Sequence, residues 1–420
     1  MSFDLPDLPE DWTYAPLDSL SQPNSATYGV VQPGAALEAG KPLIRVNNFR
    51  DTRIDLTDVM YIAPEIEAKY SRTRLKGGEV LITIVGSVGQ VAVVPSRLCG
   101  FNVARAVAVI HPLPHIAPEW IALCLRSPLS QHLLGSRANT TVQTTINLKD
   151  LRALPVPLPP VEVRHAISDF VGALDDRITL LRETNATLEA IAQALFKSWF
   201  VDFDPVRAKI EGRVPEGMDE ATAALFPDSL EETELGVVPR GWGAVRLDSR
   251  LELAYGKALK AENRKSGDVP VYGSGGITGW HDTALVHQPS VIVGRKGTVG
   301  SVYWESRPFF PIDTVFYVRT KYPLTYCHQL LKTLGLHNMN TDAAVPGLNR
   351  ENVYRLLVPD APSEILVAFD TTAHAIQRRI DHNEAQAQTL STLRDTLLPR
   401  LISGQLRVAE AQTTVEKTFA

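Results

Sequence analysis

Asp58, Glu67 and Lys69 are the residues whose types come closest to those of a catalytic site. Many nucleases hold a divalent metal ion with two carboxylates and place a lysine beside them. Here the carboxylates are loosely spaced, and short patterns of this kind recur by chance. We therefore interpret the three residues as non-catalytic, and metal-dependent DNA cleavage by the isolated chain would overturn that interpretation.

Other catalytic motifs are incomplete. Gly40-Lys41 is followed by Pro42 instead of Ser or Thr, so the sequence has no P-loop. GSGGITG at 273–279 has glycines at the wrong spacing for a nucleotide loop, and LPPV at 158–161 lacks both flanks of the Asn-Pro-Pro-aromatic motif of adenine methyltransferases. The ten His show no ligand spacing. We expect no catalytic residue, metal or cofactor in this chain.

Residue types that suit nucleic acid gather in polar, loop-like stretches. Arg and Lys bind guanine and phosphate, Asn and Gln bind adenine, and Thr suits either, although most exposed cations are merely solvated. The candidate DNA-binding residues are Arg137, Asn139, Thr140 and Gln143, followed by Lys257, Lys260, Arg264, Lys265, Arg295, Lys296, Asn338 and Asn340.

The net charge of −5 hides an uneven distribution. Residues 41–137 contain 12 Lys and Arg against 7 Asp and Glu, and residues 236–358 contain 15 against 9. Residues 202–234 contain 3 against 10. Two basic blocks with acidic connectors are compatible with phosphate contact.

The sequence contains two copies of the elements that must position these residues. LPEDWTYAPLDS at 8–19 matches VPRGWGAVRLDS at 238–249, VLITIVGSVGQV at 80–91 matches VIVGRKGTVGSV at 291–302, and INLKDLRALPVP at 146–157 matches LNRENVYRLLVP at 348–359. The offsets are 230, 211 and 202. Collinear matches of this kind indicate an internal duplication, with mixed sheet and helix in the front part of each copy.

The back part of each copy predicts a long helix with a seven-residue repeat of mostly apolar residues. The seam residues are Ile167, Leu174, Leu181, Asn185, Leu188 and Leu195 in the first helix, and Phe369, Ile376, Asn383, Leu390 and Leu397 in the second. A period of 3.5 residues favours a left-handed coiled coil, in which Asn185 and Asn383 either fix the register or are solvated. The alternative is two separate amphipathic helices, each packed on its own domain.

Two copies in one chain are expected to pack about a pseudo-two-fold axis, which makes the helices antiparallel. A helix of about 36 residues is roughly 54 Å long. Because two-fold proteins read DNA half-sites at a fixed spacing, such a strut corresponds to about 15 base pairs. The copies differ in sequence, so the predicted target is split and asymmetric.

Three segments resemble the specificity subunit of type I restriction-modification systems: ALFKSWFVDFDPV at 194–206, FPDSLEETELGVVPRGW at 226–242 and LRDTLLPRLISGQL at 393–406. The resemblance implies an α+β fold, with two mixed α/β target-recognition domains in pseudo-two-fold arrangement, separated by an antiparallel coiled coil. It also implies double-stranded DNA, two modification (adenine-N6 methyltransferase) subunits and restriction subunits as partners. S-adenosylmethionine, ATP and Mg would belong to those partners.

The resulting domain prediction has six segments. They are recognition domain 1 (1–158), conserved helix 1 (159–203), an acidic linker (204–235), recognition domain 2 (236–360), conserved helix 2 (361–408) and a flexible tail (409–420). Cys99, Cys124 and Cys327 are few and far apart, the N-terminus has no signal-peptide pattern, and no apolar run is long enough for a membrane span. These features predict a cytoplasmic protein.

Four aromatic residues, Phe196, Trp199, Phe200 and Phe203, end the first long helix. Aromatic side chains bury much area at low entropic cost, so we predict that the four anchor a modification subunit. The alternative is that they pack on the second recognition domain of the same chain. A rival to the whole interpretation is a two-headed scaffold that binds protein instead of DNA, and the steep salt dependence of DNA binding would separate the two.

Overall fold

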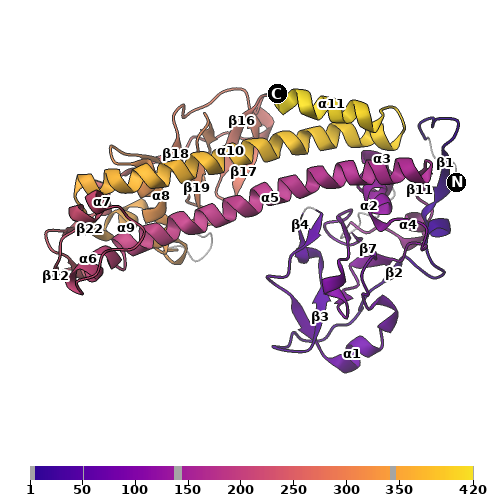
Figure 1. The fold of residues 1–420 in the computed structure, drawn as a ribbon, viewed down its shortest axis with the longest axis horizontal. Coiled ribbons are helices and arrows are strands. Elements are labelled where there is room, and N and C mark those ends of the chain that lie inside the picture. The colour runs from indigo at the N-terminus through magenta and orange to yellow at the C-terminus, as the bar shows by residue number, and fades with distance from the viewer. Residues whose placement is uncertain (1–4, 51, 137–143, 341–346, 420) are drawn as a thin grey trace. The chain divides into compact units, whose positions relative to one another are not determined.

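The computed structural model of the chain describes residues 5–50, 52–136, 144–340 and 347–419. It divides into two compact units (Figure 1). Unit 1 comprises Met1–Leu180 and Gln386–Ala420, and unit 2 comprises Leu181–Ala385. Each unit mixes sheet with helix and contains one half of each of the two long helices.

The described residues of unit 1 form two small sheets and two strand pairs. A four-stranded sheet has the order β2-β10-β7-β8, a three-stranded sheet has the order β6-β3-β9, and β1 pairs with β11 and β4 with β5. The strands are β1 (Thr13–Pro16), β2 (Thr27–Tyr28), β3 (Lys41–Ile44), β4 (Phe49–Arg50), β5 (Arg53–Ile54), β6 (Met60–Ile62), β7 (Val80–Thr83), β8 (Val91–Val93), β9 (Asn102–Val103), β10 (Val107–Ile110) and β11 (Pro155–Leu158). The short helices are α1 (Pro64–Ala68), α2 (Pro118–Arg126), α3 (Pro128–Gly135) and α4 (Leu148–Arg152).

Unit 2 repeats this plan. Its sheets have the orders β15-β21-β18-β19 and β17-β16-β20, and β14 pairs with β22. The strands are β12 (Leu230–Thr233), β13 (Gly236–Pro239), β14 (Gly243–Arg246), β15 (Glu252–Tyr255), β16 (Val269–Gly273), β17 (Gly276–His281), β18 (Ser290–Gly294), β19 (Val302–Glu305), β20 (Phe310–Pro311), β21 (Val315–Arg319) and β22 (Leu357–Asp360). The short helices are α6 (Asp204–Ile210), α7 (Glu220–Leu225), α8 (Leu324–Thr333) and α9 (Arg350–Tyr354).

The strand registers match the sequence offsets. Thr13 lies opposite Leu158 in unit 1, and Gly243 lies opposite Asp360 in unit 2. Adding the offsets of 230 and 202 to the first pair gives the second. The duplication predicted from sequence is therefore present in the strand pairing, and the α+β fold class is confirmed.

The registers also equate two tyrosines that the sequence comparison did not align. Tyr28 lies opposite Ala108, which lies opposite Ile82. Tyr255 lies opposite Phe316, which lies opposite Val293. A glycine follows each tyrosine, and a Cβ on Gly29 or Gly256 would lie 2.0 or 2.1 Å from a backbone carbonyl oxygen. Only glycine fits where the backbone passes so close.

The long helices, α5 (Val161–Phe200) and α10 (Ser363–Ile402), pair antiparallel within each unit (Figure 1). In unit 1 the start of α5 packs against the end of α10 around Ile167 and Leu397. In unit 2 the end of α5 packs against the start of α10 around Phe196 and Phe369. The heptad pattern thus predicted paired helices correctly, and the pseudo-two-fold duplication predicted their antiparallel direction.

Most of the seam residues are buried. Less than one tenth of the surface is exposed for Ile167, Leu174, Leu181, Asn185, Phe369, Asn383, Leu390 and Leu397, whereas Leu188, Leu195 and Ile376 are half-buried. Asn383 Nδ2 donates to Asn185 Oδ1 at 2.9 Å, and Asn185 Nδ2 donates to the carbonyl of Ile380 at 3.2 Å. Both asparagines are therefore buried between the helices instead of solvated.

Two segments differ from the expected connector and tail. The predicted acidic linker, 204–235, contains α6, α7 and β12, and Pro205 lies in the first turn of α6, where its missing N–H costs nothing. The predicted flexible tail forms α11 (Val408–Phe419), because Val408, Ala411 and Val415 share one helix face that packs on the core of unit 1. No helix among the described residues is long and apolar enough to cross a membrane.

Candidate nucleic-acid interface

A polar cleft of about 340 Å³ opens in unit 2. Its walls come from the end of β15, the residues that follow β18 and the start of α9, and they include Tyr255, Arg295, Lys296 and Arg350. The first two segments meet because β21 lies between β15 and β18 in the sheet, and the start of α9 joins them because the N–H of Leu348 donates to the carbonyl of Arg295 at 2.8 Å. The cleft therefore gathers two of the predicted DNA-binding residues, Arg295 and Lys296.

Two guanidinium groups stack on the ring of Tyr255 in this cleft. The guanidinium carbon of Arg295 lies 5.0 Å from the centre of the Tyr255 ring, and that of Arg350 lies 4.9 Å from it. Phe316 supports the same ring, with 5.0 Å between the ring centres. Stacking on aromatic rings orients an arginine while leaving its N–H edge able to bind an anion.

Both guanidinium groups retain unused donors. Arg295 donates from Nη1 to the carbonyl of Asp313 at 3.0 Å, and Arg350 donates from Nη1 to the carbonyl of Leu253 at 3.5 Å. Within the described part of the chain, the Nη2 group of neither arginine has a hydrogen-bond partner. Glu351 is the carboxylate on the cleft wall, 3.5 Å from Nε of Arg350, so three cations face one anion. Such a surplus of positive charge favours an anionic ligand.

A tight turn holds Arg295 and Lys296 at the cleft. Gly297 and Gly300 follow them with φ of +83° and +72°, which side chains with a Cβ rarely adopt. A Cβ on Gly300 would also lie 2.3 Å from the backbone nitrogen of His337. The two cations therefore sit on a rigid turn.

The remaining predicted residues of unit 2 lie outside the cleft walls. Lys257 and Lys260 are exposed, and Lys260 lies 3.6 Å from Glu262. Arg264 donates to the carbonyl of Thr278 at 2.7 Å, and Lys265 is exposed, 4.0 Å from Asp282. Asn338 is exposed, and Oδ1 of Asn340 accepts from the backbone N–H of Gly347, a cleft residue, at 2.9 Å. Their contact with DNA stays a prediction.

The four candidates in the first copy, Arg137, Asn139, Thr140 and Gln143, lie outside the described residues. Sequence reasoning missed two residues of the cleft, Tyr255 and Arg350. The signal for Tyr255 was the Tyr-Gly pair shared by 28–29 and 255–256. Arg350 had no such signal, since the first copy has Leu148 at the aligned position.

The nuclease-like residues do not form a site. Glu67 is buried and accepts two hydrogen bonds from Arg74, at 2.8 and 2.6 Å, and one from Asn102 at 3.0 Å. The hydrogen bonds from Arg74 hold the pKa of Glu67 below its usual value. Asp58 is instead exposed and bonded to Arg45 and Asn47. Among the described residues no cluster of three His, Cys, Asp or Glu could hold a metal ion.

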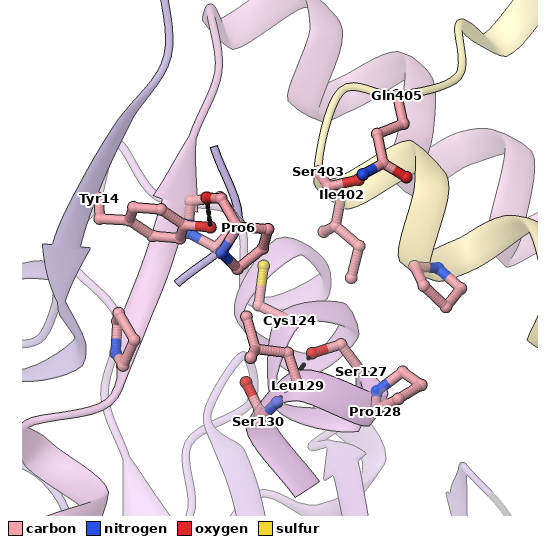
Figure 2. Close-up of a pocket in the computed structure, with 13 residues that line it drawn as sticks. Pro6, Tyr14, Cys124, Ser127, Pro128, Leu129, Ser130, Ile402, Ser403 and Gln405 are labelled. Carbon is pink, nitrogen blue, oxygen red and sulfur yellow. Dashed lines mark hydrogen bonds between the residues drawn. The ribbon is translucent and has the colours of Figure 1, made fainter. Parts of the chain in front are cut away.

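An apolar cavity of about 190 Å³ lies in unit 1 (Figure 2). Tyr14, Cys124 and Ile402 are on its wall, and Tyr14 Oη donates to the carbonyl of Pro6 at 3.0 Å. Burial raises the pKa of the Cys124 thiol well above its usual value, so this sulfur stays protonated and is a poor nucleophile. The cavity is a packing gap without the groups of an active site.

The four aromatic residues at the end of α5 lie in the core of unit 2. Phe196, Trp199, Phe200 and Phe203 expose 1%, 5%, 4% and 6% of their surface. Their rings contact Trp242, Phe226, Phe369 and Tyr326 at centre distances of 5.2–6.0 Å. This is the same-chain packing that the sequence left open, and a contact with a modification subunit stays a prediction.

Comparison with known proteins identifies similar chains. Residues 9–190 and 239–357 match the sequence model of the type I restriction modification DNA specificity domain. The chain is 37% identical over 198 residues to the specificity subunit of the type I restriction enzyme EcoBI of Escherichia coli, covering 44% of this chain and 42% of that one. It is 27% identical over 410 residues to the specificity subunit of the type I restriction enzyme HindI of Haemophilus influenzae, covering 80% and 88%.

Among solved structures, the fold is similar to that of a type I restriction-modification system S subunit from M. genitalium. The TM-score is 0.51 at 18% sequence identity, and the match covers 95% of this chain and 98% of the other. At this identity the likeness concerns the fold alone. It is consistent with the repeated strand order of the two units.

Proposed function

We propose that this chain, which belongs to the family of type I restriction modification DNA specificity proteins, reads a split DNA target with one half-site per unit. Family membership confirms the resemblance predicted from the sequence, and it indicates that the chain recognises DNA sequence. The observation that carries the proposal is the duplication: the same strand orders and registers recur in both units. Since their surface residues differ, the half-sites should differ.

The proposal assigns catalysis to other chains. Two modification subunits would methylate adenine in the half-sites, and restriction subunits would cleave unmodified DNA. S-adenosylmethionine, ATP and Mg would be bound by those subunits. The relatives named above are specificity subunits of restriction enzymes, which supports this division of labour.

Methylome sequencing tests the proposal. A host that expresses this chain with its modification subunits should acquire N6-methyladenine in one asymmetric, interrupted motif. A host with the modification subunits alone should lack that methylation. A continuous motif would contradict the split target.

DNA binding in vitro separates the proposal from a protein scaffold. The purified assembly should bind a duplex that contains the motif more tightly than one without it, and its affinity should fall steeply as salt rises. Equal affinity for both duplexes, or binding that salt does not weaken, would favour the scaffold.

A further inference from the structure

The cleft in unit 2 has a counterpart in unit 1 at the level of the backbone. The N–H of Leu348 donates to the carbonyl of Arg295 at 2.8 Å, and the N–H of Ile146 donates to the carbonyl of Ile84 at 2.9 Å. Lys296 bridges to Gly347, and Val85 bridges to Thr145. These bonds fix Ile84 and Val85 as the equivalents of Arg295 and Lys296.

The side chains at these equivalent positions have opposite chemistry. Unit 1 has Ile84 and Leu148, both buried in its core, where unit 2 has Arg295 and Arg350. A tyrosine is common to both units, because Tyr28 and Tyr255 occupy the same register, 41% and 49% exposed. Both units share the backbone hydrogen bonds and the tyrosine, which together form a common frame, and only unit 2 has arginines at these positions.

We infer that Arg295 and Arg350, which both stack on Tyr255, clamp a backbone phosphate of duplex DNA, and that Ile84 and Leu148 at the equivalent positions of unit 1 form no such clamp. The inference rests on the proposed function. It goes further in naming the DNA group that the cleft binds and in making the two units unequal contributors to affinity.

The geometry favours a phosphate as the ligand. A phosphate accepts hydrogen bonds from several directions, and arginine binds it with two parallel N–H groups. Each guanidinium has one Nη1 bonded to a backbone carbonyl, which fixes its orientation and leaves Nη2 for the ligand. Lys296 adds an exposed charge on the same wall. Three cations around about 340 Å³ leave room for a phosphodiester group.

Exchanging the residues of one copy into the other gives a direct test. The variant R295I/R350L places in unit 2 the residues that unit 1 uses at the same positions. The affinity of the complete assembly for its target duplex is then measured between low and high salt. Each phosphate contact contributes about 0.9 to the slope of log affinity against log salt. The double variant should therefore lower the slope by roughly 0.9, the contribution of the one phosphate that the two arginines clamp, with the preferred sequence unchanged.

Two further variants control the measurement. R295K/R350K keeps both charges and should retain most of the slope. R319I removes an arginine that also stacks on a tyrosine, 5.2 Å from the ring of Tyr317, but at the far end of β21. It should leave the slope unchanged. If R295I/R350L does not fold, as judged by its thermal unfolding, R295Q/R350Q removes the charges with longer side chains and gives the same comparison.

The outcomes separate this inference from the proposed function. An unchanged slope and affinity in the folded charge-removing variant would overturn the clamp. An unchanged slope with relaxed preference at one base pair would also overturn it, because the arginines would then read a base edge. If the unmodified assembly shows no preference for any sequence, the proposed function itself fails.

Discussion

Asp175 of α5 holds two arginines from other helices of unit 1. Its carboxylate accepts from Arg126 of α2 at 2.8 Å and from Arg394 of α10 at 2.7 Å. All three side chains are 14–17% exposed. Arg394 has a second carboxylate, Asp395, at 2.7 Å, whereas in the described part of the chain Arg126 has no other carboxylate within ion-pair distance. Replacing Asp175 therefore leaves Arg126 half-buried and unpaired.

The cost of Asp175→Asn follows from these contacts. A hydrogen bond to a charged group is worth about 1.5–3 kcal/mol, and removing one partner of a buried ion pair costs about 3–5 kcal/mol. Asparagine keeps the shape and one acceptor oxygen, so we expect about 3 kcal/mol. For a unit of this size that loss lowers the unfolding temperature by roughly 6–12 °C.

The adjacent residue supplies the control. Asp176 also bonds to an arginine, Arg53, at 2.9 Å, but its side chain is 78% exposed. Since exposed ion pairs contribute at most about 1 kcal/mol, Asp176→Asn should shift the unfolding free energy by less than that. Urea or thermal unfolding followed by circular dichroism measures both variants. Equal effects of the two substitutions would refute the argument that burial sets the strength of this pair.

Three further predictions concern packing and pH. Ile402→Phe should raise the free energy of unfolding by about 1 kcal/mol, because it fills part of the cavity and Phe200 is the aligned residue of the other copy; a lower unfolding temperature would contradict this. Burial lowers the pKa of His328 to about 3, so the unfolded chain takes up a proton as pH falls below about 6.5 and the folded chain does not. Stability should then fall by up to about 1.4 kcal/mol per pH unit from pH 6.5 toward pH 3, and His328→Phe should flatten that dependence in urea titrations. Trp199→Ala should destabilise unit 2 by about 3–5 kcal/mol, while Ile191→Ala on the exposed face of the same helix should cost less than about 1; an unchanged fold with lost binding of the modification subunit would instead support the anchoring role.

The sequence predicted what depends on local period and on repetition. The seven-residue repeat predicted the paired helices, the duplication predicted their antiparallel direction, and the offsets of 230 and 202 match the strand registers. The prediction from sequence was wrong where a short segment gains its structure from packing. The predicted tail forms α11 because Ala411 is buried in the core of unit 1. A twelve-residue helix has little stability without such contacts.

The sequence predicted only part of the cleft, again because packing brings together residues that are far apart in the chain. Arg295 and Lys296 stood out as adjacent cations before a glycine turn, but Tyr255 and Arg350 lie far from them in the chain. Tyr255 meets Arg295 and Lys296 because β15, β21 and β18 are neighbours in one sheet, and Arg350 lies beside them because the N–H of Leu348 donates to the carbonyl of Arg295. The spacing of residues in a single sequence does not show which strands are neighbours, although the repeated Tyr-Gly pair indicated the position of Tyr255.

Duplication explains why the two units can diverge at the cleft without losing the fold. The backbone hydrogen bonds that build the frame, from Leu348 to Arg295 and from Ile146 to Ile84, do not depend on the side chains. An apolar residue at this position joins the core, as Ile84 does, whereas an arginine reaches over the exposed tyrosine, as Arg295 does. One frame thus accepts either an apolar core residue or a cation, and under the proposed clamp this exchange would change the affinity of a unit for DNA without changing its strand register.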